Sequence, residues 1–143
     1  GEATITKSIA DNQEWIKRVM EANDLEVAGP FRIITTDFGA EKYAFDVAQP
    51  VKKKGAEGVA AEEMTLKIDG GAPVKYVRVA PHRSAHATYT GHVAGLDVAR
   101  NALRAWAVTG GNEVIDRPYE TWNGGVQKSF TPEGTYDIYW AVK

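Results

Sequence analysis

The stretch LEVAGPFRII, Leu25 to Ile34, is matched by NEVIDRPYETW, Asn112 to Trp122, with one residue inserted. In both stretches a predicted helix leads into Glu-Val, a short loop, a Pro-aromatic pair and a β-branched or aromatic strand. A second predicted strand follows each of them, KYAFDVAQPV in the first half and TYDIYWAVK in the second. The match predicts that the order strand, helix, strand, strand occurs twice along the chain.

Two amphipathic segments supply the helices of this pattern. The first is expected near Ala10–Ala22, starting at Asp11, and the second near Val93–Val108, closed by Gly110-Gly111. Apolar residues recur on one stripe of each helix, and they include Trp15 in the first helix and Leu96, Ala99, Leu103 and Trp106 in the second. Both tryptophans are therefore expected in the core.

The expected fold is α+β and occupies residues 1–143 as one domain. Repeat 1 covers about 1–51 and repeat 2 about 81–143. In the connecting segment 52–80, residues 52–63 are predicted as a solvated loop, followed by two strands around Asp69-Gly70-Gly71. Because one hairpin and one helix cannot bury both faces, the duplicated βαββ units should form a curved antiparallel sheet. Both helices would cover one face, leaving a ligand cleft between the repeats.

Composition excludes several functional classes. The 143 residues carry a formal net charge of -2 and contain no cysteine, which rules out disulfides, thiolate metal sites and a cysteine nucleophile. No Lys/Arg cluster offers nucleic acid a basic face, and no apolar run reaches membrane-spanning length. We expect a cytoplasmic location, with the periplasm left open. The sequence begins without methionine, which fits either a processed form or a domain preceded by another in a longer chain.

The last two strands hold the main candidate site. Alternation places Glu120 and Trp122 on one face of their strand, and Asp137 and Tyr139 on one face of the next. The apolar set Tyr136, Ile138 and Trp140 should pack under the helices, which sends Asp137 and Tyr139 to the open face. If Glu120 and Trp122 share that face, Glu120 lines an aromatic-walled cleft. The alternative is an exposed glutamate on a solvated sheet face.

A carboxylate among aromatic rings suits two kinds of chemistry. It attracts a cation, helped by the π faces of Trp122 and Tyr139. Alternatively, desolvation raises its pKa and makes it a general acid or base. Tyr89 is a further ligand-binding candidate, with a core position under the second helix as the alternative, and His92 is placed at the pocket rim. His82 and His86 lie roughly 13 Å apart on an extended segment, so no metal site is expected.

An ordered set of motifs resembles the GyrI-like family, the small-molecule-binding domain of multidrug-sensing and AraC-type bacterial transcription regulators. The set comprises YAFDVAQPV, TYTGHVAGL, a tryptophan late in the second helix, YETW and the terminal YDIYWAVK. The resemblance covers nearly the whole chain. It implies binding of flat, often cationic or amphipathic ligands between the repeats. Glu120 would contact the ligand, assisted by Asp137 and Tyr139.

Two departures from the family's pattern stand out. His92 and Val93 replace an aromatic residue after the Tyr-x-Gly turn, and Asp137 replaces a glutamate. Some family members hydrolyse strained cyclopropane-bearing compounds with the equivalent glutamate and nearby aromatics. The related SOUL-type domains have been linked to haem, for which only His92 is a candidate axial ligand. No helix-turn-helix segment is present, so this chain alone is not expected to bind DNA.

Two functional hypotheses follow. The first is an effector-binding or sequestration domain for a hydrophobic, cationic or amphipathic small molecule. The alternative is a hydrolase for strained electrophilic compounds, with Glu120 as general acid/base and Tyr139 orienting substrate or water. Neither requires a cofactor, and either could operate as a monomer or a homodimer. Glu120→Gln is expected to leave the fold intact and to separate the two hypotheses.

Overall fold

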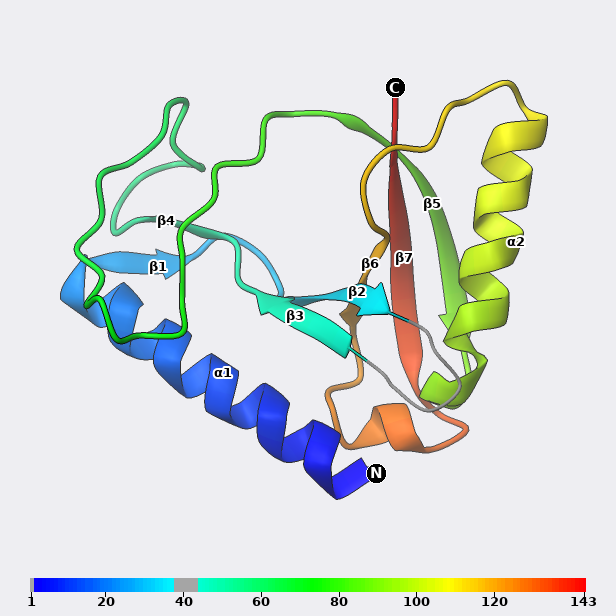
Figure 1. Cartoon of the computed structure of the whole chain (residues 1–143), viewed down its shortest axis with the longest axis horizontal. Coiled ribbons are helices and arrows are strands. Elements are labelled where there is room, and N and C mark those ends of the chain that lie inside the picture. Colours follow the sequence, from blue (N-terminus) through cyan, green and yellow to red (C-terminus); the bar gives the residue numbers. More distant parts are fainter. Residues whose placement is uncertain (1, 38–43) are drawn as a thin grey trace. The chain divides into compact units, whose positions relative to one another are not determined.

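The computed structural model describes residues 2–37 and 44–143 (Figure 1). Over these residues the protein has an α+β fold, with two α-helices, a five-stranded antiparallel sheet and a two-stranded sheet. The chain forms two compact units. Unit 1 comprises Gly1–Pro30 and Gln49–Ala80, and unit 2 comprises Phe31–Ala48 and Pro81–Lys143. Each unit is described by itself.

Unit 1 contains helix α1 (Glu2–Ala22) and strands β1 (Leu25–Val27) and β4 (Val51–Lys53). The two strands pair antiparallel, with Val27 opposite Val51. Asn23, just after α1, makes two hydrogen bonds to Lys67 in the connecting segment 52–80. Its side-chain amide donates to the carbonyl oxygen of Lys67 at 2.8 Å, and its Oδ1 accepts from the Lys67 N–H at 2.7 Å. The irregular backbone of this unit is thus partly held by side-chain hydrogen bonds.

Several sequence expectations for unit 1 are wrong. Helix α1 begins at Glu2 rather than Ala10. Asp11 is not its cap but lies on its exposed surface and bonds to Lys7 Nζ at 2.7 Å, a spacing of four residues that stabilises a continuing helix. Residues 52–53, expected in a loop, belong to β4. The turn at Asp69 is present, and its Ala72 N–H donates to the Asp69 carbonyl oxygen at 2.9 Å. The two strands expected on either side of this turn are absent from the described residues, because no described strand pairs with these segments.

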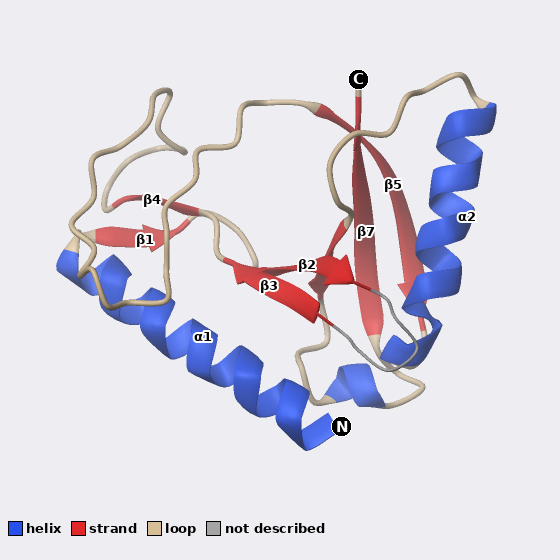
Figure 2. Cartoon of the chain, in the orientation of Figure 1, coloured by secondary structure: helices blue, strands red, loops and turns tan. Residues whose placement is uncertain are grey.

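Unit 2 is built on the five-stranded sheet (Figure 2). Its strands are β2 (Arg32–Asp37), β3 (Ala44–Ala48), β5 (Arg83–Thr90), β6 (Tyr119–Trp122) and β7 (Thr135–Val142), in the order β3-β2-β6-β7-β5. Helix α2 (Leu96–Thr109) follows a 3-10 turn at Val93–Gly95 and packs on β5 and β7. The predicted hairpin of β2 and β3 is confirmed, although its expected turn at 38–41 lies outside the described residues.

The core of unit 2 lies between α2 and the sheet. The sheet contributes Ile33, Ala85, Trp122, Tyr136 and Ile138, all buried. The buried positions of α2 are Leu96, Arg100, Leu103 and Ala107, which recur with the spacing of one helix face. Trp106 is one position off this face and is 68% exposed, so the expectation that it lies in the core is wrong.

The first described element is α1, so the repeated strand, helix, strand, strand order is not shown by the structure. Helix α1 and the five-stranded sheet belong to different units, and the placement of both helices on one sheet face stays a prediction. Neither described helix combines the length and apolar character that crossing a membrane requires.

Candidate functional site

The pairing of β6 with β7 decides which side chains share a face. Tyr119 lies opposite Tyr139, and Glu120 lies opposite Ile138. Directly opposite residues of an antiparallel pair project to the same face. Glu120 and Trp122 therefore share the face of Ile138, so the expectation that they line one cleft with Tyr139 is wrong. Alternation within one strand predicts which of its residues share a face. It does not predict which of the two sets faces Tyr139, because a shift of one residue in the pairing with β7 exchanges the two faces.

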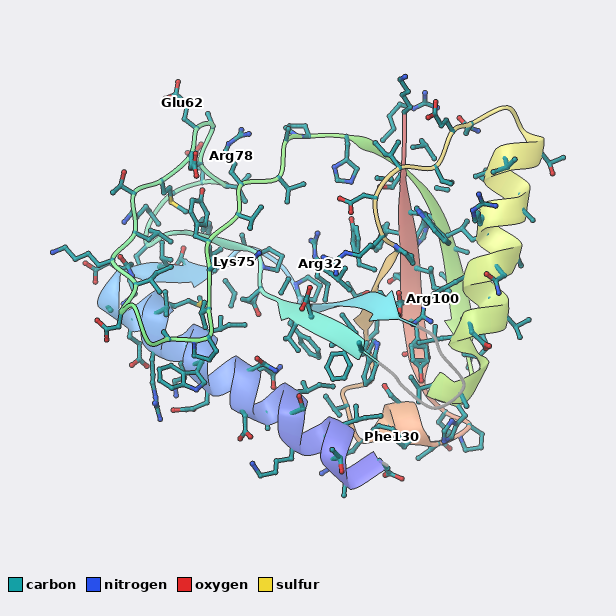
Figure 3. All side chains as sticks on the ribbon, in the orientation of Figure 1. Arg32, Glu62, Lys75, Arg78, Arg100 and Phe130 are labelled. Carbon is teal, nitrogen blue, oxygen red and sulfur yellow. The ribbon has the colours of Figure 1, made fainter. Side chains whose placement is uncertain are left out.

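Glu120 belongs to the side of the sheet that α2 covers. Its side chain is fully buried, and Oε1 accepts a hydrogen bond from Nη2 of Arg100, which α2 directs toward the sheet (Figure 3). Burial raises the pKa of the Glu120 carboxyl group, and the hydrogen bond and charge of Arg100 partly oppose this. Within the described part of the chain, Glu120 Oε2 has no hydrogen-bond partner. Glu120 and Arg100 thus form a buried ion pair that links β6 to α2.

Trp122 is a core residue on the same face. It is 4% exposed, and its ring meets those of Tyr136 and Phe130 edge to face, with centroids 6.2 and 6.3 Å away. The Tyr136 hydroxyl donates to the Ser129 carbonyl oxygen at 2.9 Å, which fixes the Tyr136 ring. These contacts form an aromatic cluster in the core of unit 2.

The opposite face of the sheet carries a row of stacked planar side chains from four strands. The rings of His86 (β5) and Tyr139 (β7) have centroids 4.9 Å apart and planes inclined by 25°. Tyr139 and Tyr119 (β6) follow at 5.1 Å and 22°. The guanidinium carbon of Arg32 (β2) lies 4.5 Å from the centroid of the Tyr119 ring. We call these four residues the stacked row.

Stacking determines which atoms the row offers to other molecules. Spacings of 4.9 and 5.1 Å match the separation of neighbouring strands, so each ring covers much of the face of the next. The rings therefore present mainly their edges and polar tips. Neither Tyr119 nor Tyr139, both half-buried, makes a hydroxyl hydrogen bond to any residue in 2–37 or 44–143. The row is an apolar ridge with two hydroxyl groups that make no hydrogen bond to the described residues.

Asp137 lies beside the row and is held by two hydrogen bonds. Its Oδ1 accepts from His86 Nε2 at 2.7 Å, and its Oδ2 accepts from the side-chain amide of Asn123 at 2.8 Å. The bond from His86 and then that from Asn123 hold the pKa of Asp137 below its ordinary value of 3.8. Burial, and then the charge of Asp137, raise the pKa of Tyr139. Asp137 and Tyr139, both expected at the site, therefore lie together on one face.

These hydrogen bonds predict a pH-dependent contribution of Asp137 to stability. Because its folded pKa is depressed, the contribution is present above about pH 4 and is lost as the pH falls through the folded pKa. We expect Asp137→Asn to be less stable than the wild type at pH 6, with the difference shrinking toward pH 2. Urea unfolding of both proteins across this range measures it. A difference that grows on acidification would contradict the prediction.

Tyr89 and His92 do not belong to the stacked row. Tyr89 is opposite Tyr136 in the ladder, on the side of α2, with ring centroids 5.4 Å apart, and its hydroxyl donates to the His92 carbonyl oxygen at 2.9 Å. His92 caps the 3-10 turn, where its Nδ1 accepts from the Ala94 N–H at 3.0 Å. Both side chains therefore have structural contacts, and a ligand-binding role for either stays a prediction.

Sequence reasoning missed three members of the row, Arg32, His86 and Tyr119. Alternation places His86 with Thr88 on one face of β5, and Tyr119 with Thr121 on one face of β6. That pattern marks a half-solvated face, but only the strand pairing brings these residues beside Tyr139. In the described ranges, no group of three or more His, Asp or Glu side chains is arranged to hold a metal ion.

No protein-family model matches this chain. A search of curated proteins finds no significant match either.

Proposed function

We propose that this protein binds an amphipathic small molecule on the stacked row. The observation that carries the proposal is the continuous row of three aromatic rings across β5, β7 and β6, on the sheet face opposite α2. Small-molecule sites are lined mainly by apolar and aromatic side chains, with a few polar groups that orient the ligand. The ring edges would contact the apolar part of the ligand, and the hydroxyls of Tyr119 and Tyr139 would bond to its polar atoms.

The structure weakens the argument for a cationic ligand. A cationic preference was expected from a free carboxylate at the site, but Glu120 is paired with Arg100 on the other face. Asp137 is on the proposed face, yet each of its oxygens already accepts a hydrogen bond from His86 or Asn123. The support for an acidic base that selects cations is therefore weaker than the support for binding itself.

The hydrolase alternative finds less support. A general acid must come within hydrogen-bonding distance of the group that it protonates. The raised pKa of Glu120 suits such an acid, but its side chain has no exposed surface and bonds to Arg100. Binding by the exposed row requires no such rearrangement.

A duplicated βαββ architecture of the GyrI-like type is part of this proposal. One correspondence between the halves supports it. In the first half, Val27 after α1 pairs with Val51 after β3. In the second half, Val114 after α2 pairs with Val142 at the end of β7. In each half a short segment after the helix thus pairs with a residue that follows or ends the last strand of that half.

Naphthalene derivatives, whose fluorescence reports binding, test the proposal. We expect at least one of four derivatives with the same ring substitution, namely naphthylmethanol, naphthoate, naphthyl phosphate and naphthylmethylammonium, to bind the wild-type protein. Tyr139→Leu removes the central ring and its hydroxyl and should weaken that binding about 10-fold, the scale of one aromatic contact. Trp106→Leu, which removes an exposed aromatic from α2, is the matched control. Unchanged binding by Tyr139→Leu would refute the proposal, as would failure of all four compounds to bind.

A further inference from the structure

Arg32 occupies one end of the stacked row and has no anionic partner among the described residues. Its guanidinium lies over the Tyr119 ring, and no Asp or Glu in the described chain comes within ion-pairing distance of it. The residue is half-buried, and its Nε is buried without a hydrogen-bond partner. A half-buried guanidinium without a carboxylate partner is stabilised when another molecule brings an anionic group to its accessible N–H groups.

The neighbouring carboxylates are already engaged. Asp46 on β3 lies opposite Ile34, on the same sheet face as Arg32, but its Oδ2 accepts from Arg117 Nη1 at 3.0 Å. Asp137 is bonded to His86 and Asn123. Arg100, the buried arginine of the other face, has Glu120 as its partner. Arg32 therefore differs from Arg100 and Arg117, each of which has a carboxylate partner.

The surroundings of Arg32 provide further donors. Tyr119 lies directly beneath its guanidinium, and Tyr139 follows at 5.1 Å between ring centroids. The pKa of Tyr139 is raised by burial, so its hydroxyl keeps its proton near neutral pH. A planar guanidinium donates two parallel hydrogen bonds to a carboxylate or phosphate, and phenol hydroxyls can add to them.

We propose that Arg32, with the hydroxyl of Tyr119, forms an oxyanion subsite for a carboxylate or phosphate group on the bound small molecule. The inference rests on the proposed function and specifies its ligand: an apolar or aromatic body against the stacked row, with an anionic group at the β2 end. It reverses the charge preference that the sequence predicted.

The same naphthalene derivatives test this charge preference. We expect the wild-type protein to bind naphthoate or naphthyl phosphate about 10- to 100-fold more tightly than naphthylmethanol, the factor that a hydrogen bond to a charged group provides. Whichever of the two anions binds more tightly identifies the natural group as carboxylate or phosphate. Naphthylmethylammonium should bind no more tightly than naphthylmethanol.

Arg32→Gln should remove the preference for anions and leave the affinity for naphthylmethanol unchanged. Arg104→Gln, which removes one positive charge from the exposed side of α2, is the matched control and should retain the preference. Arg32→Lys keeps the charge without the planar fork and should retain part of it. Circular dichroism establishes that each variant is folded. If Arg32→Gln does not fold, the wild-type comparison of naphthoate with naphthylmethanol still decides the matter.

The outcomes separate this inference from the proposed function. Equal binding of all four compounds, with loss in Tyr139→Leu, would support the binding site and overturn the oxyanion subsite. Tighter binding of naphthylmethylammonium would also overturn the subsite. An anion preference that survives in Arg32→Gln but disappears in Arg104→Gln would show that the anion binds away from Arg32, and would overturn the subsite. Absence of any binding would refute both proposals.

Discussion

Glu120→Gln is expected to lower the free energy of unfolding by about 3–5 kcal/mol, the usual effect of removing one partner from a buried ion pair. Gln has nearly the shape of Glu, so the loss does not come from packing. It arises because the Arg100 guanidinium, 3% exposed, would be left buried beside a neutral amide. The sequence-based expectation that this substitution leaves the fold intact stays a prediction, to which the ion pair adds a loss of stability.

Urea unfolding of four proteins measures the effect: the wild type, Glu120→Gln, Arg100→Met and the double variant Glu120→Leu with Arg100→Met. The double variant removes both charges and should be more stable than either single one, since apolar replacement of a buried pair is often nearly neutral. A loss below about 1 kcal/mol in Glu120→Gln would show that the pair contributes little. That result would reopen a functional role for the Glu120 carboxyl group.

Trp122→Ala is expected to lower the free energy of unfolding by about 3–5 kcal/mol, the range for deleting a large aromatic from a core. Trp122 is 4% exposed and packs against Tyr136 and Phe130. The same substitution at Trp106, which is 68% exposed on α2, should change stability by no more than about 0.5 kcal/mol.

Thermal and urea unfolding of the two alanine variants compare identical chemistry in two environments. A large loss in Trp106→Ala would indicate that this side chain is covered in solution. A small loss in Trp122→Ala would show that the aromatic cluster around it is loosely packed. Either result would contradict the assignment of the core given above.

The last strand shows how far the sequence alone could predict the structure. Alternation in TYDIYWAV placed Tyr136 and Ile138 under a helix and Asp137 and Tyr139 on the other face, and the structure confirms the division. In this strand one set is clearly more apolar than the other, so the pattern specifies the buried face. The existence and type of β2, β3, β5, β6 and α2 were predicted for similar reasons.

The failures at Glu120 and Trp106 have a common physical cause. In YETW and in α2 a charged residue occupies a buried position, and the two charges compensate each other. Because Glu120 is charged, the sequence pattern assigns it to an open face. For the same reason the pattern leaves Arg100 out of the buried stripe of α2 and includes Trp106 instead. Pairing between residues distant in sequence is set by tertiary structure, and no local pattern reveals it.

The course of the chain through unit 2 has a consequence for how the protein folds. Residues 49–80 of unit 1 intervene between β3 and β5, and Ile33 of β2 finds its partner only at Glu120 of β6. During synthesis the β2–β3 hairpin emerges long before β6, with one edge of β2 unsatisfied. Sheets closed by such non-local contacts fold slowly, and open edges promote association between chains. Assembly of the sheet is therefore expected to be the rate-limiting event, and nascent chains lacking β6 to be prone to aggregate.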